Sequence, residues 1–213
     1  MKEELFGSRS LFDWILLLSG ATVQIVVYAL SGGKVLSFVS GMAGTICVVL
    51  TSQRKVSSFV WGILQIVTYV ILCWEQRFYG EIVENAFYLA TTVGGIIIWL
   101  GKYDADKNEV MVEKLGLRGW VVWLSVFIVG TAAAAFILSK TDDTQPFLDA
   151  VTTVPAFIAQ ILLMTRYREQ WVFWLVVDLL CVAMWAVAED WCMVAQYAFW
   201  IVTCLYGLKR WSK

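Results

Sequence analysis

The chain has 213 residues, of which 60% are hydrophobic and 15% charged, and its mean hydropathy is +0.73. Soluble domains are roughly 45–50% apolar and about 25% charged, so this composition excludes a soluble globular protein and indicates a polytopic membrane protein. The net charge of −1 favours no nucleic-acid partner, and the absence of histidine removes the commonest proton shuttle and metal ligand.

Eight apolar runs follow one another along the chain, and we expect each of them to cross the bilayer. We expect all eight to be helical, because a backbone in lipid must satisfy its own hydrogen bonds. The sequence therefore predicts an all-α fold with eight transmembrane helices, in which only Glu189 and Asp190 separate the last two. The runs are Trp14–Leu30, Val35–Thr51, Phe59–Trp74, Ile82–Leu100, Trp120–Leu138, Phe147–Met164, Trp171–Ala188 and Trp191–Leu208.

The connectors between the runs carry an asymmetric positive charge. Of the 16 Lys and Arg residues, Lys34, Arg77 and Lys140 fall in one set of alternate connectors, and all the others fall in the opposite set. Basic residues gather on the cytoplasmic side of membrane proteins. Both termini are therefore predicted to be cytoplasmic, and the longest polar connector, Gly101–Arg118, lies on the same side.

An internal repeat appears when the chain is shifted by 112 residues against itself. Polar, aromatic and small residues then recur at i, i+4, i+7 and i+11 in the fourth and eighth runs, which is one stripe of a helix. One further residue of shift places Trp61 on Trp174 and Gln65 on Asp178. The identical pairs are Ala86 and Ala198, Phe87 and Phe199, Thr91 and Thr203, Gly95 and Gly207, and Trp99 and Trp211.

The second to fourth runs thus resemble the sixth to eighth, and the fifth run links them. One linker crossing makes the two halves parallel, an arrangement found in transporters with the substrate near the midplane at the repeat interface. The predicted domains are an extra N-terminal helix (1–33), repeat 1 (34–100), the charged connector with the linker helix (101–140) and repeat 2 (141–213).

Polar and aromatic residues inside these runs are the candidate site. A carboxyl or amide at membrane depth is costly, and it usually faces a bundle interior or a wet cavity. We expect no metal site, since the five cysteines show no CxxC spacing. We expect no catalytic group either, because the absence of histidine excludes a Ser-His or Cys-His nucleophile pair, and we expect no cofactor. The candidate substrate-binding residues are Trp61, Gln65, Tyr69, Asn85, Tyr88, Trp171, Trp174, Asp178, Gln196, Tyr197 and Trp200.

Several of these residues have a structural alternative. Trp171, at a helix entry, fits an interfacial belt as well as a ligand contact. Asp178 fits a bond across its own three-helix bundle, and Tyr88 and Trp200 fit core packing. Gln24 is expected to form a helix–helix hydrogen bond, and Pro155 permits a bend.

The chain resembles the PnuC vitamin transporters, whose architecture is similar to that of the SWEET sugar facilitators. The resemblance rests on the WxxW motif of Trp171 and Trp174, on Asp178 after it, and on the matched Gly-x-x-x-Trp ends at Gly95–Trp99 and Gly207–Trp211. It implies a homotrimeric carrier of the bacterial inner membrane that moves nicotinamide riboside by facilitated diffusion.

The candidate residues are compatible with nicotinamide riboside transport but do not distinguish it from transport of other solutes. Indole faces attract a pyridinium cation, and ribose hydroxyls need polar partners, but the same groups suit an uncharged sugar-like solute or another vitamin. Titration of Glu84 or Asp178 during the cycle would make the protein a proton-coupled carrier. The other hypotheses are an intramembrane enzyme that uses these two carboxyls and a membrane assembly or receptor protein with no path for solute.

Overall fold

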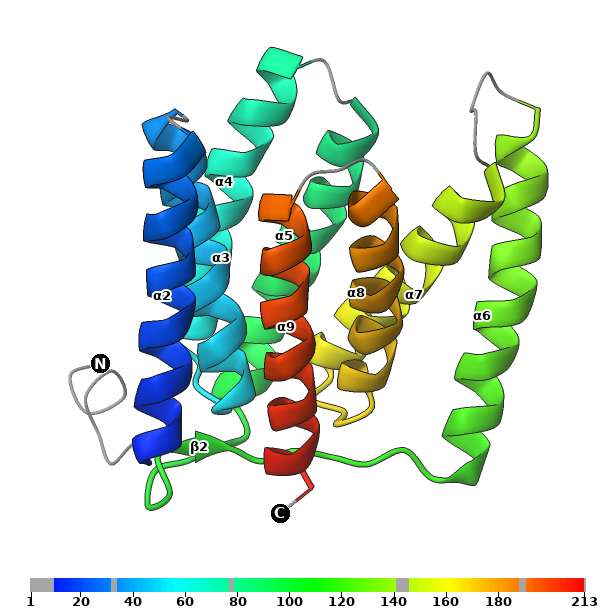
Figure 1. The fold of residues 1–213 in the computed structure, drawn as a ribbon. Coiled ribbons are helices and arrows are strands. Elements are labelled where there is room, and N and C mark those ends of the chain that lie inside the picture. Colours follow the sequence, from blue (N-terminus) through cyan, green and yellow to red (C-terminus); the bar gives the residue numbers. More distant parts are fainter. Residues whose placement is uncertain (1–9, 32–33, 77–78, 141–145, 188–190, 213) are drawn as a thin grey trace. The chain divides into compact units, whose positions relative to one another are not determined.

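The computed structural model describes residues 10–31, 34–76, 79–140, 146–187 and 191–212, and within them the chain forms eight α-helices (Figure 1). Each helix begins and ends within three residues of a predicted apolar run, so the prediction of eight helices is confirmed. The predicted turn at Glu189 and Asp190 lies outside the described residues. The helices are α2 (Leu11–Ser31), α3 (Val35–Ser52), α4 (Ser58–Gln76), α5 (Tyr79–Leu100), α6 (Leu117–Leu138), α7 (Pro146–Met164), α8 (Gln170–Val187) and α9 (Trp191–Arg210).

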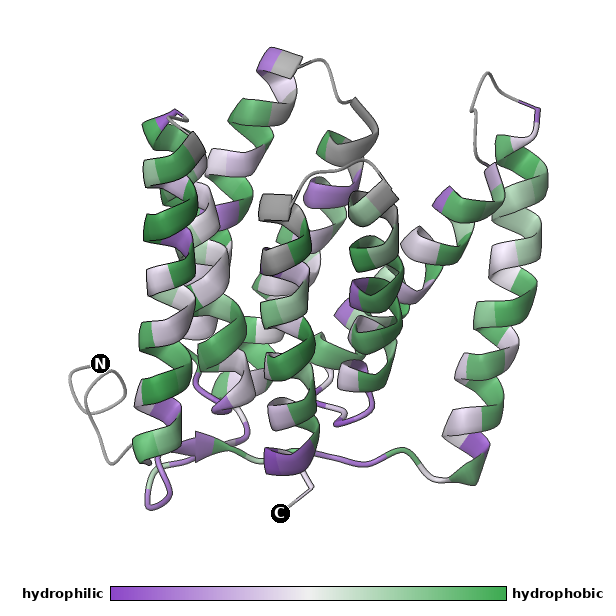
Figure 2. Ribbon diagram, viewed as in Figure 1, coloured by the Kyte–Doolittle hydropathy of each residue, from purple (hydrophilic) through white to green (hydrophobic). Residues whose placement is uncertain are grey.

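Among the described residues, α2, α3, α6 and α7 are long and apolar enough to cross a membrane by length and composition, and α4 and α8 contain shorter apolar stretches. Figure 2 shows hydrophobic residues along the helices and hydrophilic residues concentrated in the long connector after α5. This distribution fits helices that satisfy their own backbone hydrogen bonds in lipid and connectors that need water.

The chain divides into two compact units. Unit 1 comprises Met1–Met111 with Lys209–Trp211 and Lys213. In it α2 packs on α3, α3 on α4, and α4 on α5. Gln24 of α2 donates from Nε2 to Thr45 Oγ1 of α3 at 3.2 Å, so the predicted helix–helix hydrogen bond is confirmed.

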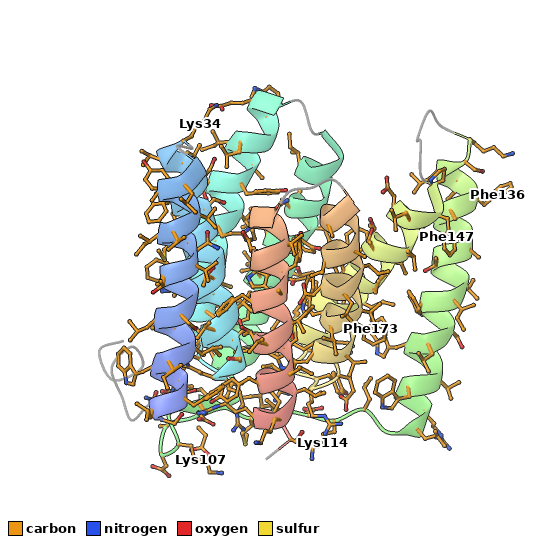
Figure 3. The ribbon with its side chains drawn as sticks, viewed as in Figure 1. Lys34, Lys107, Lys114, Phe136, Phe147 and Phe173 are labelled. Atoms are coloured by element: carbon orange, nitrogen blue, oxygen red, sulfur yellow. The ribbon has the colours of Figure 1, made fainter. Side chains whose placement is uncertain are left out.

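Unit 2 comprises Val112–Leu208 and Ser212, and in it α6 packs on α7 and α7 on α8. Buried residues of α7 and α8, among them Ile158, Leu162 and Phe173, form its core, and Trp120 of α6 stacks on Phe173 with ring centroids 6.3 Å apart. The rest of α6 is largely exposed, and Phe136 has 65% of its surface accessible. Figure 3 shows Phe136 on the outer face of this helix.

The connector after α5 contains a short antiparallel hairpin that the all-α prediction did not include. Strand β1 (Tyr103–Asp104) pairs with β2 (Glu109–Val110), and Tyr103 lies opposite Val110. Two residues are too short for an alternation of apolar and polar side chains to show in the sequence. The hairpin depends on the turn chemistry of Asp104 and on Asn108, whose φ is 53°.

The turn from α3 to α4 and the turn from α7 to α8 have the same backbone hydrogen bonds. Lys55 N donates to Leu50 O at 3.1 Å, and Tyr167 N donates to Leu162 O at 2.8 Å. Donors and acceptors are 112 residues apart in the two turns, as are the first residues of α4 and α8 and of α5 and α9. This spacing agrees with the shift found in the sequence, and the repeat itself stays a prediction.

Candidate substrate site

A buried carboxyl lies between α8 and α9 of unit 2. Asp178, which is 3% exposed, accepts a hydrogen bond from the thiol of Cys204, with 3.2 Å between Sγ and Oδ2. A carboxyl in an apolar bundle is stable only where it finds such partners. This contact is the bond across its own bundle that the sequence left open for Asp178, and it fixes which faces of the two helices meet.

Aromatic rings lie on the same two helix faces. Trp174 is one turn before Asp178 on α8, and Tyr197 is about two turns before Cys204 on α9. Both rings pack against the small cluster of Ala156, Val177 and Cys181. Unit 2 therefore places a carboxyl, a thiol and two rings around the middle of α7, α8 and α9.

Two further features of this cluster concern α9 and α7. The rings of Tyr197 and Trp200 meet edge to face with centroids 5.2 Å apart. Within the described part of the chain, the buried Nε1 of Trp200 has no hydrogen-bond acceptor, and an unsatisfied buried donor costs about 1–3 kcal/mol. On α7, the buried Pro155 lies next to Ala156 and removes one helical hydrogen bond, which permits a bend there.

Trp171, the first tryptophan of the WxxW motif, has different surroundings from Trp174. It is 2% exposed and its indole covers Gly207 of α9, where an added Cβ would come within 2.4 Å of Cε2. Such burial does not fit an interfacial belt. The contact shows that Trp171 fills the space between α8 and α9, so packing is part of its role whether or not it also touches substrate.

The other candidate residues of the first repeat lie on α4 and α5 of unit 1. The side chain of Gln65 covers Gly44 of α3, where an added Cβ would lie 3.2 Å from Cγ. Asn85 is buried, and the hydroxyl of Tyr88 donates to Glu84 Oε1. Their assignment as substrate contacts stays a prediction, as it does for the half-buried Trp61 and Tyr69 of α4 and Gln196 of α9.

Sequence reasoning missed Cys204, because a cysteine in an apolar run resembles any small core residue. A signal existed: Cys204 follows Trp200 by four residues and Tyr197 by seven, so all three share one face of α9. The scarcity of positive charge around the site, by contrast, could be seen in the sequence. The helices α7 and α8 contain no Lys or Arg, and α9 carries its basic residues, Lys209 and Arg210, only in its last turn.

Long apolar helices with a polar cluster inside one bundle define a polytopic membrane protein of the transporter class. The family model described as "Nicotinamide mononucleotide transporter" matches residues 34–213. Over its full length the chain is 30% identical to "Nicotinamide riboside transporter PnuC" of Neisseria mucosa, of which it covers 85%, and 30% identical to the protein of that name from Haemophilus influenzae, of which it covers 95%. The chain belongs to the PnuC family.

A solved structure supports the fold. The structure titled "Crystal structure of the Vitamin B3 transporter PnuC" matches with a TM-score of 0.85 at 29% sequence identity, over 99% of this chain and 94% of that chain. The family resemblance predicted from the WxxW motif is thus confirmed. The family is one of membrane transporters rather than enzymes, and the bacterial relatives together with the apolar helices identify a multi-pass inner-membrane protein.

Proposed function

We propose that this protein is a uniporter for nicotinamide riboside, which it binds near the middle of the bilayer between the two three-helix repeats. The names of the relatives support this substrate. The observation that carries the proposal is the buried carboxyl of Asp178 on the same helix faces as Trp174 and Tyr197. Nicotinamide riboside is a flat pyridinium cation, and rings with a nearby carboxyl are the partners that such a cation needs.

The same charges favour the riboside over the mononucleotide named in the family description. A phosphate group needs Arg, Lys or several N–H donors to offset its loss of water. The cluster offers it the carboxyl of Asp178 instead. The helices α7 and α8 contain no Lys or Arg, and those of α9 lie only in its last turn. Two negative groups at membrane depth repel each other strongly, so we expect the mononucleotide to be excluded.

We expect the ribose to have a partner of its own. The described residues supply no acceptor for the buried Nε1–H of Trp200, and this supports a hydrogen bond from it to a sugar hydroxyl. Such a bond would remove the cost of a buried unsatisfied donor only while substrate is bound. The alternative, a proton-coupled carrier of another vitamin or sugar-like solute, depends on titration of Glu84 or of the same Asp178. Flux that is independent of an imposed pH gradient would exclude it.

Calorimetric titration of the purified protein tests the proposal. We expect nicotinamide riboside to bind and nicotinamide mononucleotide to bind at least about 100-fold more weakly. Asp178→Asn should weaken riboside binding about tenfold, which corresponds to about 1.4 kcal/mol. It should leave binding of the reduced, uncharged riboside unchanged. Trp174→Ala should weaken both, because it removes a ring wall.

The matched control is Leu179→Ala, next to Asp178 on the exposed side of α8, which should bind like the wild type. Equal affinity for riboside and mononucleotide would contradict the charge argument. Uptake of riboside into proteoliposomes then separates a transporter from a binding protein without a path for solute.

A further inference from the structure

The connector after α5 is fastened to the turn between α3 and α4 in unit 1. Val110 N donates to Arg54 O at 3.0 Å. The guanidinium of Arg54 forms an ion pair with Glu109, with 2.8 Å between Nη2 and Oε2, and both side chains are mostly buried. One turn residue thus binds the connector through its backbone and its side chain.

The connector is fastened in the same way to the turn between α7 and α8 in unit 2. Glu113 N donates to Arg166 O at 2.9 Å, and Arg168 N donates to Glu113 O at the same distance. The guanidinium of Arg166 pairs with Glu113, with 2.6 Å between Nη2 and Oε1. Arg54 and Arg166 are 112 residues apart, and each lies two residues after the end of its helix.

Both arginines have a backbone conformation that is unfavourable for their residue type. Their φ angles are 57° and 66°, a region that non-glycine residues seldom adopt and that glycine enters freely. The Schellman end of each helix, with the bonds Lys55 N to Leu50 O and Tyr167 N to Leu162 O, requires this conformation. Glycine is the usual residue there, so the helix end accounts for the φ angle and not for the arginine. At each turn the strained residue is the one whose carbonyl and guanidinium both bind the connector, so the strain accompanies a specific contact.

Only Met111 and Val112 separate the two contacts, and the boundary between unit 1 and unit 2 falls between these two residues. We propose that the connector is a clasp: the pair Arg54–Glu109 holds its first end within unit 1, and the pair Arg166–Glu113 holds its second end within unit 2. Met111–Val112 between them is then a short hinge, and the last turn of α9 is a second place where the chain passes from one unit to the other. The four charged residues hold the two ends of the hinge and take no part in substrate binding. This inference rests on the proposed transport function, since a carrier alternates between two arrangements of its halves.

Flux and binding measured on the same variants test the clasp. Glu113→Gln and Arg166→Gln should lower maximal riboside flux into proteoliposomes about tenfold, with the Kd within about twofold of the wild type. The exchanged pair, Glu113→Arg with Arg166→Glu, should restore at least about half of the flux, because the attraction is recovered. Insertion of two glycines between Met111 and Val112 should lower flux in the same way with both pairs intact.

The control is Glu75→Gln, which removes the exposed ion pair with Lys34 between α3 and α4 of unit 1, and it should transport like the wild type. Wild-type flux in Glu113→Gln, an equal loss of binding and flux, or no recovery in the exchanged pair would overturn the clasp. If the substituted variants do not fold, the glycine insertion tests the clasp by the same comparison of maximal flux with the Kd for riboside.

A measurement without substrate separates failure of the clasp from failure of the proposed function. If the wild type neither binds nor transports riboside, the proposed function is wrong. Amide hydrogen exchange of residues 103–115 then tests the clasp. Glu113→Gln should speed exchange in this segment and leave α7 and α8 protected. Unchanged exchange there, or equal loss of protection in the helices, would overturn it.

Discussion

Trp171 and Trp174 are three residues apart and lie in different surroundings. Trp171 covers Gly207, and Trp174 packs with Tyr197 around Ala156. The motif that contains them therefore includes a residue that sets the distance between two helices, and a substrate contact of the other residue stays a prediction. At the scale of single residues, chemical type predicts a role only once its neighbours are known.

The contact of Trp171 with Gly207 gives a prediction for stability. Gly207→Ala places a Cβ within 2.4 Å of the indole, so the ring or α9 has to move, at a cost of about 1–3 kcal/mol. We expect a lower midpoint of thermal unfolding in detergent. Gly116→Ala is the control, because nothing lies within 4 Å of its added Cβ and its φ is −76°. Equal midpoints for Gly207→Ala and the wild type would show that the indole or α9 moves to accommodate the added Cβ without loss of stability.

Among the elements, α9 is divided between the two units. Its last turn belongs to unit 1, where Trp211 is fully buried against Trp99 and donates from Nε1 to Thr51 O at 3.2 Å. Arg210 pairs there with Asp13 and Glu109. These partners explain why the helix continues two residues past the predicted apolar run, since its terminal charge is paired rather than exposed.

We expect the stability of the hairpin in the connector to depend on pH. The backbone N–H of Lys107 donates to Asp104 Oδ1 at 3.2 Å. This hydrogen bond is the main reason that the pKa of Asp104 is lower than its ordinary value of 3.8. The ammonium group of Lys107 lowers the pKa further. A lowered pKa stabilises the hairpin fully above the ordinary value, and this contribution is lost as the pH falls through the folded-state pKa.

Amide chemical shifts of Asp106 and Lys107 over a titration from about pH 5 to about pH 2.5 should therefore show a midpoint below 3.8. Asp104→Asn keeps an acceptor oxygen and cannot titrate in this range, so its amide shifts should stay constant. A midpoint above 3.8 would mean that the carboxyl is not held by these donors in solution.

For the whole molecule, the distribution of basic residues predicts the orientation in the membrane. In unit 1, Lys34 and Lys107 lie at opposite ends of the helices (Figure 3). Basic residues are few in the set of connectors that contains Lys34 and Lys140, and they are frequent in the opposite set. The prediction is that both termini are cytoplasmic.

Reporter fusions measure this orientation. A fluorescent protein fused after Lys213 should fluoresce, and alkaline phosphatase there should be inactive. Alkaline phosphatase inserted after Lys140 should be active. The opposite pattern would reverse the orientation. The homotrimer implied by the family likeness stays a prediction, and light scattering of the protein in detergent measures it.

The helices and the family could be predicted from the amino-acid sequence alone. All eight apolar runs became helices with bounds shifted by three residues or fewer, and Gln24 formed the expected bond to a neighbouring helix. These properties are local: a bilayer needs about 20 apolar residues per crossing, and an amide within such a run has to find a partner. The WxxW motif with Asp178 is a local pattern as well.

Which residues are partners became known only from the folded chain. It brought Cys204 to Asp178, Gly207 to Trp171, and Glu113 to Arg166, pairs that are distant in the sequence. In a soluble protein, hydropathy indicates which face of a helix is buried. In a membrane protein the lipid-facing and packed faces are both apolar, so hydropathy cannot distinguish them, and close packing and hydrogen bonds select the contacts instead.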